Sequence, residues 1–281
     1  ISGAASYKIK PANLSIGVGV NLIKSEINTV RARNGDGSDD LVNRTPRTEQ
    51  YPDGEPAFYD NLKEGRGLVD LSSWDLGLGV GLVYQPTDEL YIGLSYQSQP
   101  GFGEQELTGS AKKILAQSDN EDDEATATQS MPDVVRWGIR YNYGKGEARL
   151  FGDYARWSLF EKQCISTKGR DDCDLANIPR NWEDAFGIRA GYSYFMNENI
   201  ELYFGGGYDG NAVPDEYLEP ALYDAEKFSG ALGGRFVMLD GALAIAATYT
   251  QIFYVDRETE AWPRDPNTGR VGASLSVWKD Q

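Results

Sequence analysis

The chain has 281 residues, a formal net charge of −16 and a mean hydropathy of −0.50. Because nucleic acid attracts basic surfaces, this acidic balance argues against a nucleic-acid partner. The absence of histidine excludes histidine-based acid–base catalysis and histidine metal ligation, and no apolar run approaches the ~20 residues of a membrane-spanning helix.

In the first third of the chain, apolar residues alternate with glycine, serine and asparagine over several short segments. A tight turn at 10–13 joins the first two segments, a long polar stretch at about 30–70 follows, and Pro86-Thr87-Asp88 marks another tight turn. The strands predicted from this alternation are 1–9, 14–22, 74–84 and 90–96.

The rest of the chain repeats the pattern after a polar segment at 100–130. Tight turns at 144–146, 196–199 and 239–241 alternate with longer polar connections, among them a loop at about 161–181. The remaining predicted strands are 135–143, 147–160, 182–195, 200–208, 228–236, 243–249 and 271–277. The sequence thus predicts about eleven antiparallel strands of membrane-spanning length, with short connections at one end and long ones at the other.

The segment 182–195 shows why lipid is the expected surroundings of these strands. One of its faces carries aromatic and aliphatic residues, and the other carries glycine, serine, alanine and Arg189. A soluble β-sandwich also alternates, but its second face would be rich in threonine, lysine and glutamate. Glycine and arginine instead fit the crowded interior of a barrel, so the sequence predicts an all-β, antiparallel transmembrane β-barrel.

Several segments, taken in order, resemble the FadL-type outer-membrane transporters of long-chain fatty acids and other hydrophobic compounds. The residues that carry the resemblance are 7–21, 74–96, Met131-Pro132-Asp133, 153–158, Trp182-Glu183-Asp184 followed by Arg189, Gly191 and Tyr192, and Tyr208-Asp209 with Val213-Pro214-Asp215. The resemblance implies a protein of the bacterial outer membrane that is not an enzyme and that takes up hydrophobic molecules passively. The alternatives are a general porin and a structural barrel that anchors a cell-surface assembly.

The resemblance also implies about fourteen strands and an N-terminal plug, whereas the pattern gives about eleven strands and no plug. A single open sheet would leave two unpaired edges in lipid. We therefore expect residues 1–281 to form one barrel domain, incomplete at its N-terminus, that closes with a missing segment or with other chains. A smaller closed barrel is the less favoured alternative. The other expected partners are outer-membrane lipid, lipopolysaccharide and a hydrophobic small-molecule ligand.

Five arginines are expected on the inner face of the strands, where their guanidinium groups could bind a ligand carboxylate. They are Arg136, Arg140, Arg149, Arg189 and Arg235. The alternative, which the sequence favours, is an internal network of ion pairs that fills the barrel. Its acidic members would be Asp75, Asp153, Glu201 and Asp209.

The two cysteines, Cys164 and Cys173, lie close together in a polar segment, and a disulfide between them is the favoured prediction over two free thiols. The acidic segments 34–40 and 119–124 offer oxygen ligands for calcium. The first lacks the downstream glutamate of an EF-hand loop, and solvated loops are favoured for both. No metal site and no cofactor are therefore predicted.

Overall fold

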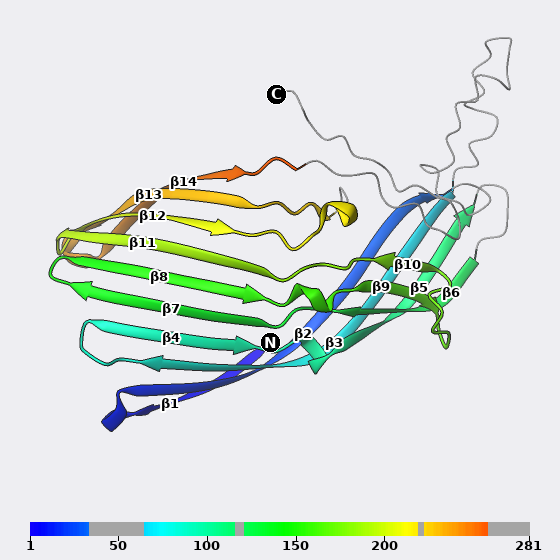
Figure 1. Cartoon of the computed structure of the whole chain (residues 1–281), viewed down its shortest axis with the longest axis horizontal. Helices are drawn as coiled ribbons and strands as arrows, with labels where there is room; N and C mark the ends of the chain where they lie inside the picture. Colours follow the sequence, from blue (N-terminus) through cyan, green and yellow to red (C-terminus); the bar gives the residue numbers. More distant parts are fainter. Residues whose placement is uncertain (34–64, 116–120, 219–221, 258–281) are drawn as a thin grey trace, which may run out of the picture.

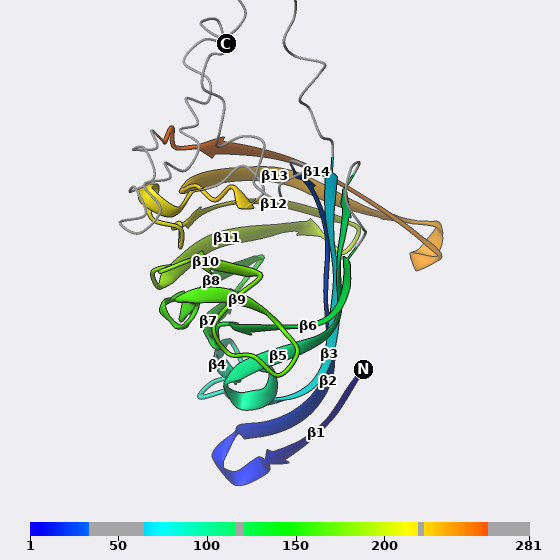
Figure 2. The same ribbon diagram turned by 90° about the vertical axis from the view of Figure 1, so that its right-hand side faces the viewer.

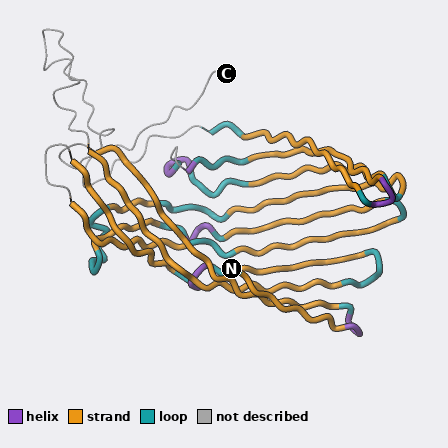
Figure 3. Tube along the Cα trace, turned by 180° about the vertical axis from the view of Figure 1, so that it is seen from behind, coloured by secondary structure: helices purple, strands orange, loops and turns teal. Residues whose placement is uncertain are grey.

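The computed structural model describes residues 1–33, 65–115, 121–218 and 222–257. Within these ranges, fourteen strands form one antiparallel sheet, and the helices are short 3-10 turns (Figure 3). None of the described helices has the length and apolar character needed to cross a membrane.

Ten strands form the main part of the sheet, which we call the wall. Each wall strand pairs with the next in an antiparallel manner, and tight turns join them at one end (Figure 1). In sheet order they are β1 (Ser2–Ile9), β2 (Leu14–Arg33), β3 (Gly65–Tyr84), β4 (Leu90–Gln97), β7 (Val134–Tyr143), β8 (Gly146–Ala155), β11 (Ala185–Asn197), β12 (Ile200–Asp209), β13 (Lys227–Met238) and β14 (Leu243–Tyr254).

The sheet forks at β3, which is long enough to pair with two different neighbours. Residues 79–84 of β3 pair with β4 and continue the wall, whereas residues 65–72 pair with β5. A second branch, which we call the extension, starts there and curls away from the wall (Figure 2). It comprises β5 (Glu104–Leu115), β6 (Glu121–Ser130), β9 (Lys162–Thr167) and β10 (Ala176–Pro179).

The apolar face of the sheet changes sides along β2 and β3. In the lower half of β2, Val18 and Val20 lie exposed on the outer face of the wall. Lys24 and Glu26 continue the same face higher up, while Ile27 on the other face packs against a buried core. Lipid suits the lower half and water the upper half, so the reversal marks the level at which these strands leave the membrane.

A buried hydrophobic cluster lies where the extension joins β3. Leu71 of β3 and Leu107 of β5 are 1% and 0% exposed, and they pack with Ala125, Ala127 and Ile165. Beside this core, the predicted disulfide between Cys164 and Cys173 is confirmed. A closed loop of this length stabilises a fold by about 3 kcal/mol, chiefly by restricting the unfolded chain.

The outer face of the wall is an exposed apolar band, as the alternation predicts. Phe204 and Leu232 are cross-strand partners in mid-strand, and each remains 63% exposed. Ile188 and Leu202 are 40% exposed. These side chains do not meet in a dry protein centre, and this excludes the soluble-sandwich alternative for the wall.

The structure corrects the predicted loops. The segment predicted as a polar loop at 100–130 contains β5 and β6, and the predicted cysteine loop contains β9 and β10. The polar stretch at 30–70 is shorter than predicted, because β2 extends to Arg33 and β3 begins at Gly65. The count of about eleven strands is therefore too low, while the predicted strand at 271–277 lies outside the described residues.

The wall is an open sheet within the described ranges. Strand β1 pairs only with β2, and β14 pairs only with β13, so each leaves one edge without a described partner.

The acidic residues 121–124, predicted to be a solvated loop, lie in β6. Asp122 and Glu124 there pair with Lys112 and Lys168 at 2.7 and 2.6 Å. The other acidic segment, 34–40, lies outside the described residues.

Candidate functional site

The inner face of β1 to β4 is almost bare of large side chains. Ser6, Gly17, Gly81 and Ser95 are successive cross-strand partners and form a row over four strands. Two hollows of about 510 and 410 Å³ lie along this row. We call this row and the hollows above it the small-residue lane.

Arg136 stands at the end of the lane, because its cross-strand partner on β4 is Ser95. Its guanidinium donates to the side-chain oxygen of Gln97 at 3.2 Å. No carboxylate of the described residues lies within ion-pair distance of it, since Asp153, opposite Arg136 on β8, is bound to Arg189. Arg136 borders both large hollows and is exposed to them.

Arg189 lies across the sheet between two carboxylates. It binds Asp153 on β8 at 2.6 Å and also contacts Asp209 on β12. Gly187 is the cross-strand partner of both aspartates. A Cβ atom at Gly187 would meet their Oδ1 atoms at 3.0 and 3.1 Å and the Arg189 guanidinium at 3.2 Å. The missing side chain therefore makes room for this ion triad.

Replacing Gly187 with alanine is expected to separate Arg189 from one or both aspartates and to destabilise the wall by about 1–2 kcal/mol. Gly191→Ala on the same face of β11 is the matched control, because a Cβ there has 3.7 Å of clearance to the Phe204 carbonyl oxygen. Urea unfolding in lipid vesicles measures both variants. Equal urea midpoints for Gly187→Ala and Gly191→Ala would show that the ion triad does not depend on the space left at Gly187.

Arg140 and Arg149 face each other across β7 and β8 near the tight turn at 144–145. Glu147 contacts Arg149 and lies 3.7 Å from Arg140, whose guanidinium stacks 4.4 Å from the centre of the Tyr91 ring. A third hollow of about 350 Å³ adjoins both arginines. Glu147 and Tyr91 were not predicted from the sequence, although Glu147 lies two residues from Arg149 and therefore on the same face of β8.

The predicted ion-pair network is confirmed at Arg189 and at Arg235, which lies 3.7 Å from its cross-strand partner Glu201. It is wrong for Asp75, which instead accepts hydrogen bonds of 2.6 Å each from Ser73 and Gln105. The ligand-binding role of the five arginines stays a prediction. Within the described ranges, no group of three or more cysteine, aspartate or glutamate side chains is placed to hold a metal.

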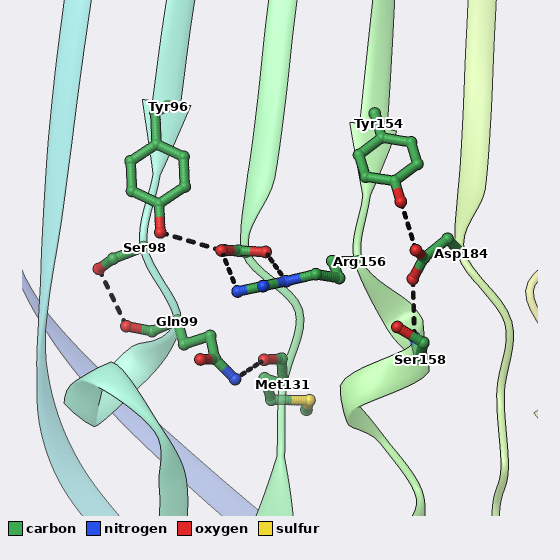
Figure 4. Close-up of polar contacts among 9 residues, drawn as sticks. Tyr96, Ser98, Gln99, Met131, Tyr154, Arg156, Ser158 and Asp184 are labelled. Carbon is green, nitrogen blue, oxygen red and sulfur yellow. Dashed lines mark hydrogen bonds and ion pairs between the residues drawn. The ribbon is translucent and has the colours of Figure 1, made fainter.

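Side-chain hydrogen bonds and ion pairs join neighbouring hairpins at the end of the wall opposite the tight turns, which we call the rim (Figure 4). We call each such set of contacts a clasp. Tyr96, at the end of β4, donates a 2.9 Å hydrogen bond to Asp133, which precedes β7. Arg156, just after β8, binds both oxygens of the same carboxylate at 2.9 and 2.7 Å. Asp133 is 8% exposed, so these three charge-assisted bonds compensate for its burial.

The next hairpin along the wall repeats the clasp. Tyr154 of β8 donates to Asp184, which precedes β11 and also accepts the Ser158 amide at 2.9 Å (Figure 4). Burial opposes ionisation of Asp184, but these hydrogen bonds outweigh it and lower the pKa of its carboxyl group. The clasps fix adjacent strands where they leave the apolar band.

Comparison with known proteins agrees with this architecture. The family model of outer membrane transport proteins (OMPP1/FadL/TodX) matches residues 1–270. Outer membrane protein P1 of Haemophilus influenzae is 24% identical over 242 residues, which are 84% of this chain and 51% of that protein, so the chain spans about half the length of this curated relative.

Solved structures share the fold at low sequence identity. A Pseudomonas aeruginosa FadL homologue superposes with a TM-score of 0.73 at 15% identity, and the match covers 96% of this chain and 63% of the homologue's chain. The Ralstonia pickettii toluene transporter TbuX gives a TM-score of 0.51 at 16% identity, over 89% of this chain and 64% of its own. The chain therefore belongs to the OMPP1/FadL/TodX family of outer membrane transport proteins.

Proposed function

We propose that this chain forms part of a passage for hydrophobic molecules across the bacterial outer membrane. The observation that carries the proposal is the two-sided wall, which has an apolar band outside and a small-residue lane with two large hollows inside. The family consists of channels and not of enzymes. The proposed transport is accordingly passive, with capture at the external side, passage along the lumen and release into the bilayer.

The lane suits an elongated apolar molecule for a physical reason. Glycine exposes backbone that is already hydrogen-bonded within the sheet, so the lane is smooth and has few unpaired polar groups. Ser6, Gly17, Gly81 and Ser95 leave the space that larger side chains would fill. An acyl chain lying there gains dispersion contacts along its whole length.

Long-chain fatty acids are the substrates that we propose, over uncharged hydrocarbons. The support is Arg136, which stands beside the lane without a carboxylate partner among the described residues. A neutral hydrocarbon would gain nothing from a guanidinium group, whereas a carboxylate head would accept charge-assisted hydrogen bonds from it.

Gly81→Leu tests the proposal, because it places a side chain in the lane, where a Cβ meets no described atom closer than 3.9 Å. We expect the complete protein with this change, reconstituted in vesicles, to take up oleate severalfold more slowly than the parent. Ala231→Leu, on the same face but outside the lane, is the control and should retain uptake.

Three other results would contradict the proposal. Unchanged oleate uptake by Gly81→Leu would remove the lane from the passage. Passage of small polar solutes without any preference for oleate would favour a general porin. A stable partner at the external side, with no flux of either kind, would favour a structural anchor.

A further inference from the structure

Two like charges stand directly opposite each other on the inner face of the wall. Arg140 of β7 and Arg149 of β8 are cross-strand partners, close to the tight turn that joins these strands. Like charges in this position destabilise an antiparallel pair. Arg189 and Arg235, by contrast, each have an acidic residue on the neighbouring strand within ion-pair distance.

One carboxylate serves both arginines. Glu147 holds Arg149 closely, but its second oxygen lies 3.7 Å from Arg140, too far for a hydrogen bond. No other carboxylate of the described residues reaches either guanidinium within ion-pair distance. Because Glu147 is only 8% exposed, it cannot reorient freely toward Arg140, and the cluster keeps a net positive charge.

The charge faces a space that a ligand can enter. The hollow of about 350 Å³ beside the two arginines has an apolar floor made by Val83, Phe151 and two glycines. The side chains of Arg140 and Arg149 line this hollow and are 46% and 50% exposed. A guanidinium pair over an apolar floor is complementary to an oxyanion that carries an apolar tail.

We infer that Arg140 and Arg149 form an oxyanion-binding station at the tight-turn end of the inner wall. The station holds the acidic head of an amphipathic molecule, while the apolar part of that molecule lies against Val83 and Phe151. Arg140 donates the hydrogen bonds that Glu147 is too distant to accept. The inference rests on the proposed function, since it adds a binding site to the same passage.

The test is calorimetric titration of the complete protein in lipid nanodiscs, with empty nanodiscs subtracted, using laurate and the uncharged dodecanol. In the double variant Arg140→Gln, Arg149→Gln, laurate affinity should fall about tenfold or more, while dodecanol affinity stays unchanged. Glu147→Gln should raise laurate affinity because it frees both guanidiniums, and a gain of this kind cannot result from misfolding.

Arg235→Gln is the matched control, since it removes one inner-wall arginine that has its own partner, Glu201. Its laurate affinity should stay within about twofold of the parent. An equal loss in this control would assign the effect to overall charge and overturn the station, as would parental affinity in the double variant. Tighter binding of dodecyl phosphate than of laurate, lost in the double variant, would support the station and assign it a phosphate head.

The two proposals fail in different ways. If the parent binds neither laurate nor dodecanol, the proposed function fails together with the station. If the parent and every variant bind both compounds equally well, only the station is overturned, and a passage for hydrophobic molecules remains.

Discussion

Replacing Leu232 with arginine is expected to destabilise the membrane-inserted protein by about 2–4 kcal/mol. Leu232 lies in the middle of β13, 63% exposed on the outer face and opposite Phe204. In the membrane this exposure is to hydrocarbon, where a guanidinium loses its hydration and finds no described carboxylate on the same face nearby. Urea unfolding in lipid vesicles, followed by tryptophan fluorescence, measures the change.

Ala231→Arg is the control for Leu232→Arg because it adds the same side chain at the preceding residue, on the opposite face. Ala231 pairs with Gly205 and Thr250, which leave room for a long side chain toward the inner space. We expect a change below about 1 kcal/mol for this variant, because water hydrates the inner face. Equal destabilisation by the two variants would contradict the assignment of lipid and lumen to the two faces.

The lipid-facing part of the wall was predictable because its alternation keeps the same phase within that part of each strand. Leu232, Ile188 and Leu202 fall on the outer face in both the sequence pattern and the structure. The sides of the inner arginines follow from the same period of two. The opposition of Arg140 and Arg149 was also within reach of the sequence, since a two-residue turn at 144–145 fixes the register of that hairpin.

The extension was missed because its pattern is reversed and weak. After Leu22 the apolar residues of β2 lie on the inner face instead of the outer one. The sequence pattern therefore predicted that the strand ends at residue 22 and that a polar loop follows, although β2 continues. In β5, Leu107 is the one large residue of the buried core, and its neighbours on the outer face are Glu106 and Thr108. A strand in water with a small core lacks the aromatic and aliphatic run that identifies a membrane strand.

The pairing of particular charges depends on strand register and on space, which single-strand patterns do not contain. Arg189 was assigned correctly to an acidic network, but its position between Asp153 and Asp209 requires both neighbours of β11 and the gap at Gly187. The rim clasps likewise join residues on different hairpins. Asp75 lacks an ion pair because Gln105, on a strand that was not predicted, occupies its oxygen.

The attachment of the extension to the wall depends on Gly109, where β5 meets β3. Gly109 is the cross-strand partner of Leu71, and a Cβ atom there would collide with the carbonyl oxygen of Asp70 and lie 3.1 Å from the Cα atom of Leu71. Backbone cannot give way as a flexible side chain can. Gly109→Ala is therefore expected to push β5 off β3 and to destabilise the extension by about 3 kcal/mol.

The loss should be local, because the core of the extension, including Leu107, is separate from the lipid-facing band that holds the wall. Limited proteolysis of the protein in intact membranes should therefore cut Gly109→Ala within the extension while the wall stays protected. Gly103→Ala is the control, since its backbone is extended and a Cβ there meets nothing within 4 Å. If Gly109→Ala resists protease as well as Gly103→Ala does, the close approach of β3 and β5 does not hold the extension in place.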